Sequence, residues 1–227
     1  MAADEALLRS ALDRGVASLR FYTWDEPTLS LGYFQSHADR LSDPLLANVA
    51  WVRRPTGGAA ILHDLEITYA LALPAGPLWH TSESWLCRFH HAVASALKDF
   101  EVESRAVACG EEKKLGPFLC FQHQTPGDLL VEGHKVVGSA QRRPHGATMQ
   151  HGSILLRRSP HAPALPGIVD LSAKNIAEAE LESAIIQALG KETGWTFEPA
   201  DWTAGEQATA HELECTKYAT RDWNAKR

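Results

Sequence analysis

The sequence predicts an α+β domain in which helices pack on a mixed, mainly antiparallel sheet. Strand-like stretches come in clusters separated by helical stretches, without a regular alternation of strand and helix. Strand candidates are joined by short turns at Gly133 and Gly146, which is typical of antiparallel pairing. At 227 residues the chain is long enough for one sizeable core, so we expect a single domain over residues 1–227.

The first third of the chain predicts a helix, a hairpin and a long strand. Residues up to Arg14 can form a short amphipathic helix. The stretch LRFYTWDEPTLSLGYFQ carries strand-like residues on both sides of Pro27, which predicts a hairpin turn there. In residues 66–73, EITYALAL, large apolar side chains alternate with polar or small ones, which is typical of a half-buried strand.

The remainder predicts three helices and an antiparallel group of strands. Ser82 is a good N-cap for an amphipathic helix that runs to Phe100. Strand candidates follow in DLLVEG, HKVVGSAQRR and ATMQHGSILLR, and the proline-rich SPHAPALPGI predicts a loop. Apolar residues at i, i+3 and i+4 over 181–189 predict a helix that ends near Gly194. TAGE at 203–206 has the spacing of a capping box for a further helix.

Composition narrows the class of protein. The net charge is −6 and the 22 basic residues are dispersed, so no cationic stripe is available for nucleic acid. The first residues contain no apolar signal-like region, and no run of about 18 apolar residues occurs. We therefore expect a cytoplasmic protein with neither nucleic acid nor a membrane as partner. The four cysteines form no CxxC pair, which indicates free thiols.

A glycine pair marks the first candidate for a site, in RRPTGGAAILHD from Arg53 to Asp64. Glycines behind a proline let backbone N–H groups approach a ligand closely. The stretch is either a binding loop, with an arginine near an anion or carbonyl, or a turn with exposed arginines. It is not a P-loop, because no Gly-Lys-Ser/Thr follows at the required spacing.

A cysteine and a lysine fifteen residues apart form the second candidate, Cys120 and Lys135. Lys135 begins a strand in which Val137, Ser139 and Gln141 follow at alternate positions, so these side chains are expected to face the same way. Taken singly, the thiol could be a small core side chain and the lysine a solvated one. A fixed ammonium near the thiol would instead favour the thiolate, which is the nucleophilic form.

The histidines offer little support for a metal. Cys120 and His123 could supply two zinc ligands, but no second pair at finger spacing and no HExxH occurs, so we expect no metal. His63 and His151 lie beside the glycine-containing segments and are expected at the pocket, either as lining or as proton-transfer groups. His90, like His91, is expected to be a half-exposed helix residue.

Several segments together resemble the biotin/lipoate protein ligase superfamily, in its lipoyl and octanoyl transferase branch. They are RRPTGGAAILHDLEITYAL, VEGHKVVGSAQRR and MQHGSILL, with LRFYTWDEPTLSLGYFQ and KYATRDWNAKR adding to the likeness. The resemblance implies an α+β catalytic domain that moves a medium-chain acyl group onto a lysine of a lipoyl domain or of the glycine-cleavage H protein. Cys120 and Lys135 match, at the same spacing, the nucleophilic cysteine and its partner lysine in octanoyltransferases of the firmicute monofunctional type.

The resemblance also implies a donor and further site residues. Octanoyl would come from acyl carrier protein and be held as a thioester on Cys120, which requires no ATP and no other cofactor. The glycine loop and the lysine strand would line an apolar tunnel for the acyl chain and offer N–H donors to its carbonyl. The residues implied in substrate binding are Arg54, Thr56, Gly57, Gly58, His63, Gly138, Ser139 and Ala140.

Three other functions are consistent with the same residues. One is an ATP-dependent lipoate ligase, although Ala59 stands where ligases carry a third glycine and LEIT follows where they have a GN-rich segment. Another is an amidotransferase that moves octanoyl between two lipoyl-bearing proteins with the same cysteine chemistry. The last is a non-catalytic protein that binds lipoyl domains or acyl groups, which an intact Cys120 and Lys135 pair disfavours.

Overall fold

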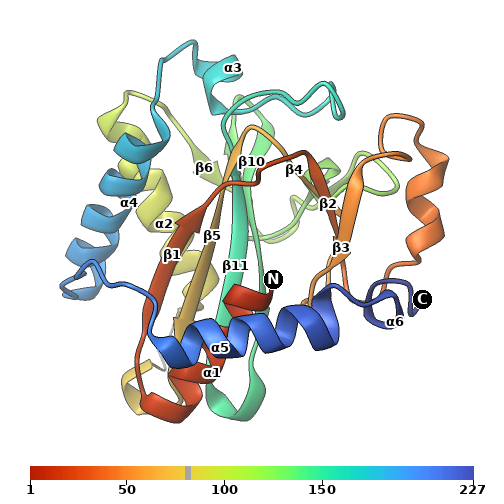
Figure 1. Ribbon diagram of the computed structural model, residues 1–227. Helices are drawn as coiled ribbons and strands as arrows, with labels where there is room; N and C mark the ends of the chain where they lie inside the picture. The colour runs from red at the N-terminus through yellow and green to blue at the C-terminus, as the bar shows by residue number, and fades with distance from the viewer. Residues whose placement is uncertain (80–82) are drawn as a thin grey trace.

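A six-stranded sheet forms the centre of the computed structural model, which describes residues 1–79 and 83–227. The strand order is β1-β5-β11-β10-β9-β6, and every neighbouring pair is antiparallel (Figure 1). The strands are β1 (Ser18–Tyr22), β5 (Glu66–Leu73), β6 (Arg105–Ala106), β9 (Leu129–Val131), β10 (His134–Arg142) and β11 (Thr148–Leu155). The predicted α+β class is confirmed, as is the antiparallel pairing of the strands on either side of Gly133 and Gly146.

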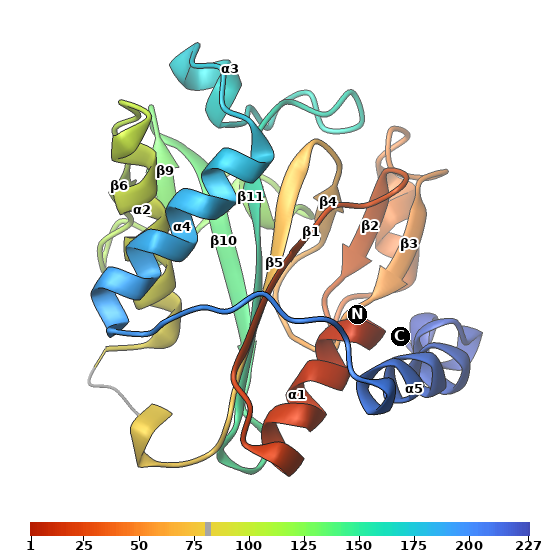
Figure 2. The same cartoon turned by 60° about the vertical axis from the view of Figure 1, so that its left-hand side comes forward.

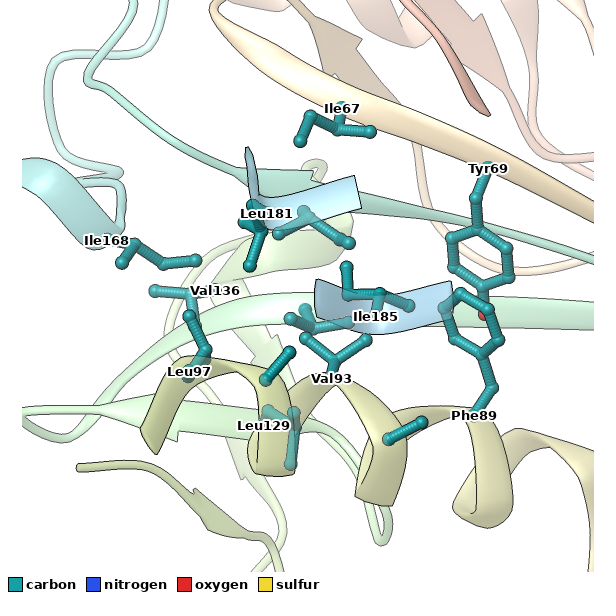
Figure 3. Close-up of a cluster of buried hydrophobic side chains, with 14 of the residues drawn as sticks. Ile67, Tyr69, Phe89, Val93, Leu97, Leu129, Val136, Ile168, Leu181 and Ile185 are labelled. Carbon is teal, nitrogen blue, oxygen red and sulfur yellow. The ribbon is translucent and has the colours of Figure 1, made fainter. Parts of the chain in front are cut away.

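Two long helices, α2 (Trp85–Asp99) and α4 (Glu178–Thr193), cover one face of this sheet and form the main core with it. In Figure 3 the rings of Tyr69 and Phe89 stack between strand and helix, with their centroids 3.8 Å apart. Each large apolar side chain buried in this way contributes about 1.5–3 kcal/mol. The short helix α3 (Ile168–Ser172) adds Ile168 to the same cluster.

The opposite face of the sheet is covered in part by α1 (Ala2–Arg14), which packs against α5 (Ala204–Leu213) (Figure 2). Ala72 of β5 contacts Leu7 and Ala11 of α1 in a separate apolar cluster. All of β5 is therefore buried, and the prediction that this strand is half-buried is wrong. The small side chains that suggested an exposed face instead leave room for a helix.

A second, three-stranded sheet lies beside this face, with β2 (Thr28–Leu31) between β3 (Ala50–Arg53) and β4 (Ile61–His63). β2 pairs in parallel with β3 and antiparallel with β4. β1 and β2 thus belong to different sheets, and the predicted hairpin around Pro27 is wrong. Both stretches are strands, but each finds its partner far along the chain.

The predicted helix ends at Gly194 and Thr203 are confirmed, whereas the N-cap of α2 differs from the predicted one. α2 begins after Ser84, whose side chain accepts a hydrogen bond from the Cys87 N–H, while the predicted cap Ser82 lies outside the described residues. α4 ends at Gly194 in the left-handed conformation, and Thr203 forms the predicted capping box of α5. Within residues 1–79 and 83–227, no helix has the length and apolar character needed to cross a membrane.

The remaining elements are short. They are the strands β7 (Lys113–Lys114) and β8 (His123–Gln124), the short 3-10 helices η1 (His37–Ser42), η2 (Pro77–Trp79), η3 (Cys120–Gln122) and η4 (Pro144–Gly146), the π-helical turn η5 (Glu214–Tyr218), and the helix α6 (Arg221–Asn224).

Candidate active site

Cys120 and Lys135 lie in contact, as the resemblance of this pair to a family motif implied. The Nζ of Lys135 is 3.6 Å from the Sγ of Cys120, and it also donates to the carbonyl oxygens of His123, at 3.1 Å, and of Cys120 itself, at 3.5 Å. The lysine is buried near the start of β10, whereas the cysteine is partly exposed at the first position of η3. A partly exposed thiol beside a fixed ammonium is the environment of a reactive cysteine.

Asp128 is the second partner of this ammonium. Its Oδ2 lies 2.7 Å from the Nζ of Lys135, and both side chains are almost fully buried. The same oxygen accepts hydrogen bonds from the backbone N–H and the hydroxyl of Thr125, so the carboxylate is held in the turn before β9. Asp128 is not among the site residues predicted from the sequence. The available signal was the turn TPGD, in which a threonine stands three residues before an aspartate.

A β-bulge decides which way Lys135 points. On β10, Lys135 pairs with Leu130 of β9 and Val137 pairs with the adjacent Leu129, so Val136 is an extra residue. The bulge reverses the alternation of side chains, and the prediction that Lys135 and Ser139 face the same way is wrong. The Ser139 hydroxyl instead lies 2.5 Å from the Tyr69 hydroxyl, on the face covered by α2.

Gly138 leaves the space that the lysine side chain occupies. A Cβ at this position would lie 2.5 Å from the Cε of Lys135 and 3.0 Å from its Nζ. Any larger residue would therefore displace the ammonium. Ala140 follows on the same face of β10 and pairs in register with His151 of β11, so the lysine strand continues toward the glycine loop.

Arg54 holds the glycine loop from the inside. Its guanidinium donates to the carbonyl oxygen of Ser30 at 2.8 Å, and to the loop carbonyls of Gly57 at 2.8 Å and Ala59 at 2.7 Å. Burial lowers the pKa of Arg54 to about 10, although the nearby Cys120 favours its charge. The sequence left open whether the arginines are exposed or lie near an anion or carbonyl. In the structure Arg54 is buried and donates to backbone carbonyl oxygens of the glycine loop.

The glycine loop and the cysteine loop are joined by backbone hydrogen bonds. Ala60 donates to the carbonyl oxygen of Phe118 at 3.2 Å, and the N–H of Cys120 donates to the carbonyl oxygen of Ala60 at 2.7 Å. These bonds accompany a parallel bridge between Ala60 and Leu119. The thiol is therefore fixed relative to Gly57 and Gly58, while its own backbone N–H is already occupied.

Two buried histidines connect this region to carboxylates. His63 lies 2.7 Å from the Ser30 hydroxyl through Nε2 and 3.0 Å from Glu66 through Nδ1, and it stacks on Trp24. The structure thus places His63 behind the strand that Arg54 holds. It does not place a polar atom of His63 against Cys120 or Lys135.

His151 reaches the glycine loop itself. Its Nε2 lies 2.6 Å from the Thr56 hydroxyl and its Nδ1 lies 3.4 Å from Oδ2 of Asp4, which α1 supplies. Burial lowers the pKa of His151, although Asp4 opposes this shift, so the ring is neutral near pH 7. Burial disfavours the charge of Asp4 too, but nearby cationic groups and the bond with His151 hold its pKa well below the usual range.

His90 is buried, and the prediction that it is a half-exposed helix residue is wrong. Its Nδ1 donates to the carbonyl oxygen of Gly127 at 2.6 Å, and its Nε2 lies 2.6 Å from the Ser139 hydroxyl. Because Gly127 directly precedes Asp128, His90 secures the turn that carries the partner of Lys135. Burial lowers the pKa of His90 to about 4.

Comparison with known proteins places the chain in a family. Residues 1–186, which include every site residue named above, match the family described as the lipoyl protein ligase A/B catalytic domain. The chain belongs to this family. The resemblance read from the sequence motifs is therefore confirmed.

Curated members of the lipoyl protein ligase A/B family match almost the whole chain. The octanoyltransferase LipM of Carboxydothermus hydrogenoformans is 33% identical, over 98% of this chain and 92% of its own length. The octanoyltransferase LipM of Bacillus subtilis is also 33% identical, over 100% of this chain and 93% of its own length.

Solved structures of family members share the fold. A putative lipoate protein ligase from T. acidophilum, Ta0514, superimposes with a TM-score of 0.78 at 22% identity, over 100% of this chain and 92% of its own. A lipoate-protein ligase A bound with ATP gives a TM-score of 0.77 at 22% identity, over 99% and 92% of the two chains. At this identity the likeness concerns the fold alone.

Proposed function

We propose that this chain is an octanoyltransferase that holds octanoyl as a thioester on Cys120 and passes it to a lysine of a lipoyl domain or of the glycine-cleavage H protein. The observation that carries the proposal is the 3.6 Å contact between the Sγ of Cys120 and the Nζ of Lys135, in a chain whose full-length relatives are named octanoyltransferases. Residues 1–227 would act as one catalytic domain.

In the first half-reaction, the Cys120 thiolate attacks the carbonyl carbon of the octanoyl thioester on the donor. The bond between that carbon and the donor sulfur breaks, and the donor leaves as a thiol after taking up a proton. The ammonium of Lys135, held by Asp128, stabilises the attacking thiolate. No ATP is needed, because one thioester replaces another.

In the second half-reaction, the ε-amino group of the acceptor lysine attacks the acyl carbonyl. An amide bond forms, the amine loses a proton, and Cys120 leaves as a thiolate beside the same ammonium. We infer that the acyl chain lies along Thr56, Gly57 and Gly58 on one side and along Gly138 and Ala140 on the other. Arg54 and His63 would shape this region through the loop and strand they bind, and Ser139 through Tyr69 and His90.

The donor in this proposal is acyl carrier protein, and the compartment is the cytoplasm. Free thiols such as those of the four cysteines suit that location. Cys120 is the thiol that the proposal assigns to catalysis, because it is the cysteine in contact with a buried ammonium.

The proposal is tested by incubating the protein with octanoyl carrier protein in the absence of ATP. Intact-protein mass spectrometry is expected to show one added octanoyl group, removable by hydroxylamine, on the wild type and none on Cys120→Ala. Adding a lipoyl domain should then transfer the group to its lysine. An absolute requirement for ATP would identify a ligase, and an undiminished adduct on Cys120→Ala would refute the thioester.

A parallel incubation separates the amidotransferase function. An octanoylated lipoyl-bearing protein replaces the carrier as donor, with all other conditions unchanged. The proposal expects loading to be at least about tenfold faster from carrier protein, because a thioester is a more reactive acyl donor than an amide. Faster loading from the octanoylated lipoyl protein would show that the chain moves octanoyl between two acceptors.

A further inference from the structure

A small two-stranded ribbon leads directly into the reactive cysteine. β7 pairs antiparallel with β8, with Lys114 opposite His123, and the N–H of Leu115 extends the ladder by donating to the carbonyl oxygen of Gln122 at 2.7 Å. The helix η3, which begins at Cys120, runs into β8. Among the described residues, no further strand pairs with the outer edge of β7.

The outer strand of this ribbon is exposed and cationic. Lys113 and Lys114 are both exposed, and the next residue, Leu115, has 66% of its surface accessible. Within residues 1–79 and 83–227, neither lysine forms an ion pair with a carboxylate. The nearby Glu111 is bound at 2.7 Å by Arg105.

The two exposed lysines contrast with the negative net charge of the whole chain. With a net charge of −6, the chain as a whole does not attract an acidic protein, so such a partner is expected to bind where cations are locally exposed. An exposed leucine beside two lysines adds an apolar contact to the charges. Because η3 connects the ribbon to the thiol, a protein seated on β7 has its attached group within reach of Cys120.

We propose that the edge formed by Lys113, Lys114 and Leu115, here called the KKL edge, is the docking surface for the acyl donor, a small acidic protein that carries octanoyl on a thioester arm. The inference rests on the proposed function and specifies the surface at which the donor binds. The lysines meet carboxylates of the donor and increase the rate of productive encounter, and the leucine packs against its apolar side chains.

The test compares two octanoyl donors on the variant Lys113→Glu/Lys114→Glu. Loading of Cys120 is followed by intact mass, with octanoyl carrier protein or with the uncharged thioester octanoyl-N-acetylcysteamine as donor. We expect the rate from the carrier protein to fall by about tenfold or more at low ionic strength, and by less at high salt. The rate from the small thioester should be unchanged.

Two control variants separate local charge from overall charge. Lys98→Glu/Lys191→Glu changes the net charge by the same amount at exposed positions on α2 and α4, outside the KKL edge, and should leave both rates unchanged. Glu112→Gln removes the exposed carboxylate beside the KKL edge and should raise the rate from the carrier protein.

The experiment distinguishes an error in the proposed docking surface from an error in the proposed octanoyltransferase function. Loading of the wild type from neither donor would refute the thioester chemistry itself. Normal loading of the double variant from the carrier protein, or an equal loss with both donors, would overturn the docking surface. A defect confined to transfer from preloaded enzyme to a lipoyl domain would assign the KKL edge to the acceptor and likewise overturn the proposal.

Discussion

The ammonium of Lys135 lies 2.7 Å from a carboxylate oxygen of Asp128 and 3.6 Å from the sulfur of Cys120, so one buried cation serves two acidic groups. In the proposed mechanism, Asp128 is the counter-ion of Lys135 in the steps in which no thiolate is present.

Replacing Asp128 with Asn should weaken both folding and catalysis. The change leaves a buried ammonium without its counter-ion, which typically lowers the free energy of unfolding by about 3–5 kcal/mol. Denaturant unfolding measures this loss, and the rate of octanoyl loading at pH 7 should fall as well. In the double variant Asp128→Leu/Lys135→Met, stability should recover while loading stays low. Equal recovery of both would contradict the role of the pair.

Lys135→Met should slow alkylation of Cys120 near neutral pH, because the thiolate loses the adjacent cation. Peptide mass spectrometry after brief iodoacetamide treatment reports each cysteine separately. The exposed Cys109 and Cys215 serve as internal references that should not change. Unchanged labelling of Cys120 would count against an electrostatic role for the lysine.

Gly138→Ala should reduce octanoyl loading by about tenfold or more, because the new methyl group would lie 2.5 Å from the Cε of Lys135 and must displace it. Single-turnover loading is the measurement. Gly205→Ala in α5 is a matched control, since no atom beyond the neighbouring residues and the backbone of its own helix lies within 4 Å of the added Cβ. That control should be neutral or stabilising by up to about 1 kcal/mol. Full activity in Gly138→Ala would show that the ammonium is not needed at its observed position.

Arg54→Lys should loosen the glycine loop, because one ammonium cannot reach the carbonyl oxygens of Ser30, Gly57 and Ala59 together. Hydrogen exchange over residues 55–60 should accelerate, and the KM for the acyl donor should rise. Exchange in β5, on the main sheet, should remain as in the wild type. Unaltered exchange in the loop would mean that the backbone holds its shape without the guanidinium.

His90 should make stability depend on pH below neutrality. Its pKa is lowered by burial from 6.5 to about 4, so the imidazole is neutral in both states above pH 6.5 and its contribution is complete there. As the pH falls from 6.5 toward 4, the unfolded chain binds a proton that the folded one excludes, and the free energy of unfolding drops by up to about 3 kcal/mol. Urea unfolding between pH 7 and pH 4.5 should show a shallower decline in His90→Asn. Parallel declines would exclude His90 as the source.

Much of this fold was predictable from local signals. The capping box at Thr203, the left-handed Gly194 and the turn at Gly133 each depend on neighbouring residues alone, so sequence patterns suffice. The pairing of Cys120 with Lys135 was also expected, because the two residues match a family motif, although β8, β9 and two turns lie between them. Which strands pair with each other could not be predicted from local signals. β1 and β2 have the composition of hairpin strands, yet each pairs with residues far away.

The bulge and the ion pair could not be predicted, for physical reasons. Val136 and Val137 are both fully buried, so hydrophobic alternation does not mark which residue is the extra one. Asp128 meets Lys135 only after β9 and β10 pair with that bulge in place. The burial of the Arg54 side chain could not be predicted either, because an arginine near a glycine pair is equally typical of an exposed turn.

The bulged strand and the cysteine loop also differ in how each is held in the fold. Lys135 is fixed by pairing on β10, by the space at Gly138 and by Asp128, so its charge cannot move without rebuilding the sheet. The thiol of Cys120 is supplied by a segment that connects the glycine loop to β8. In the proposed mechanism, the sheet thus holds the cation in place, and a connecting segment brings the nucleophile to it.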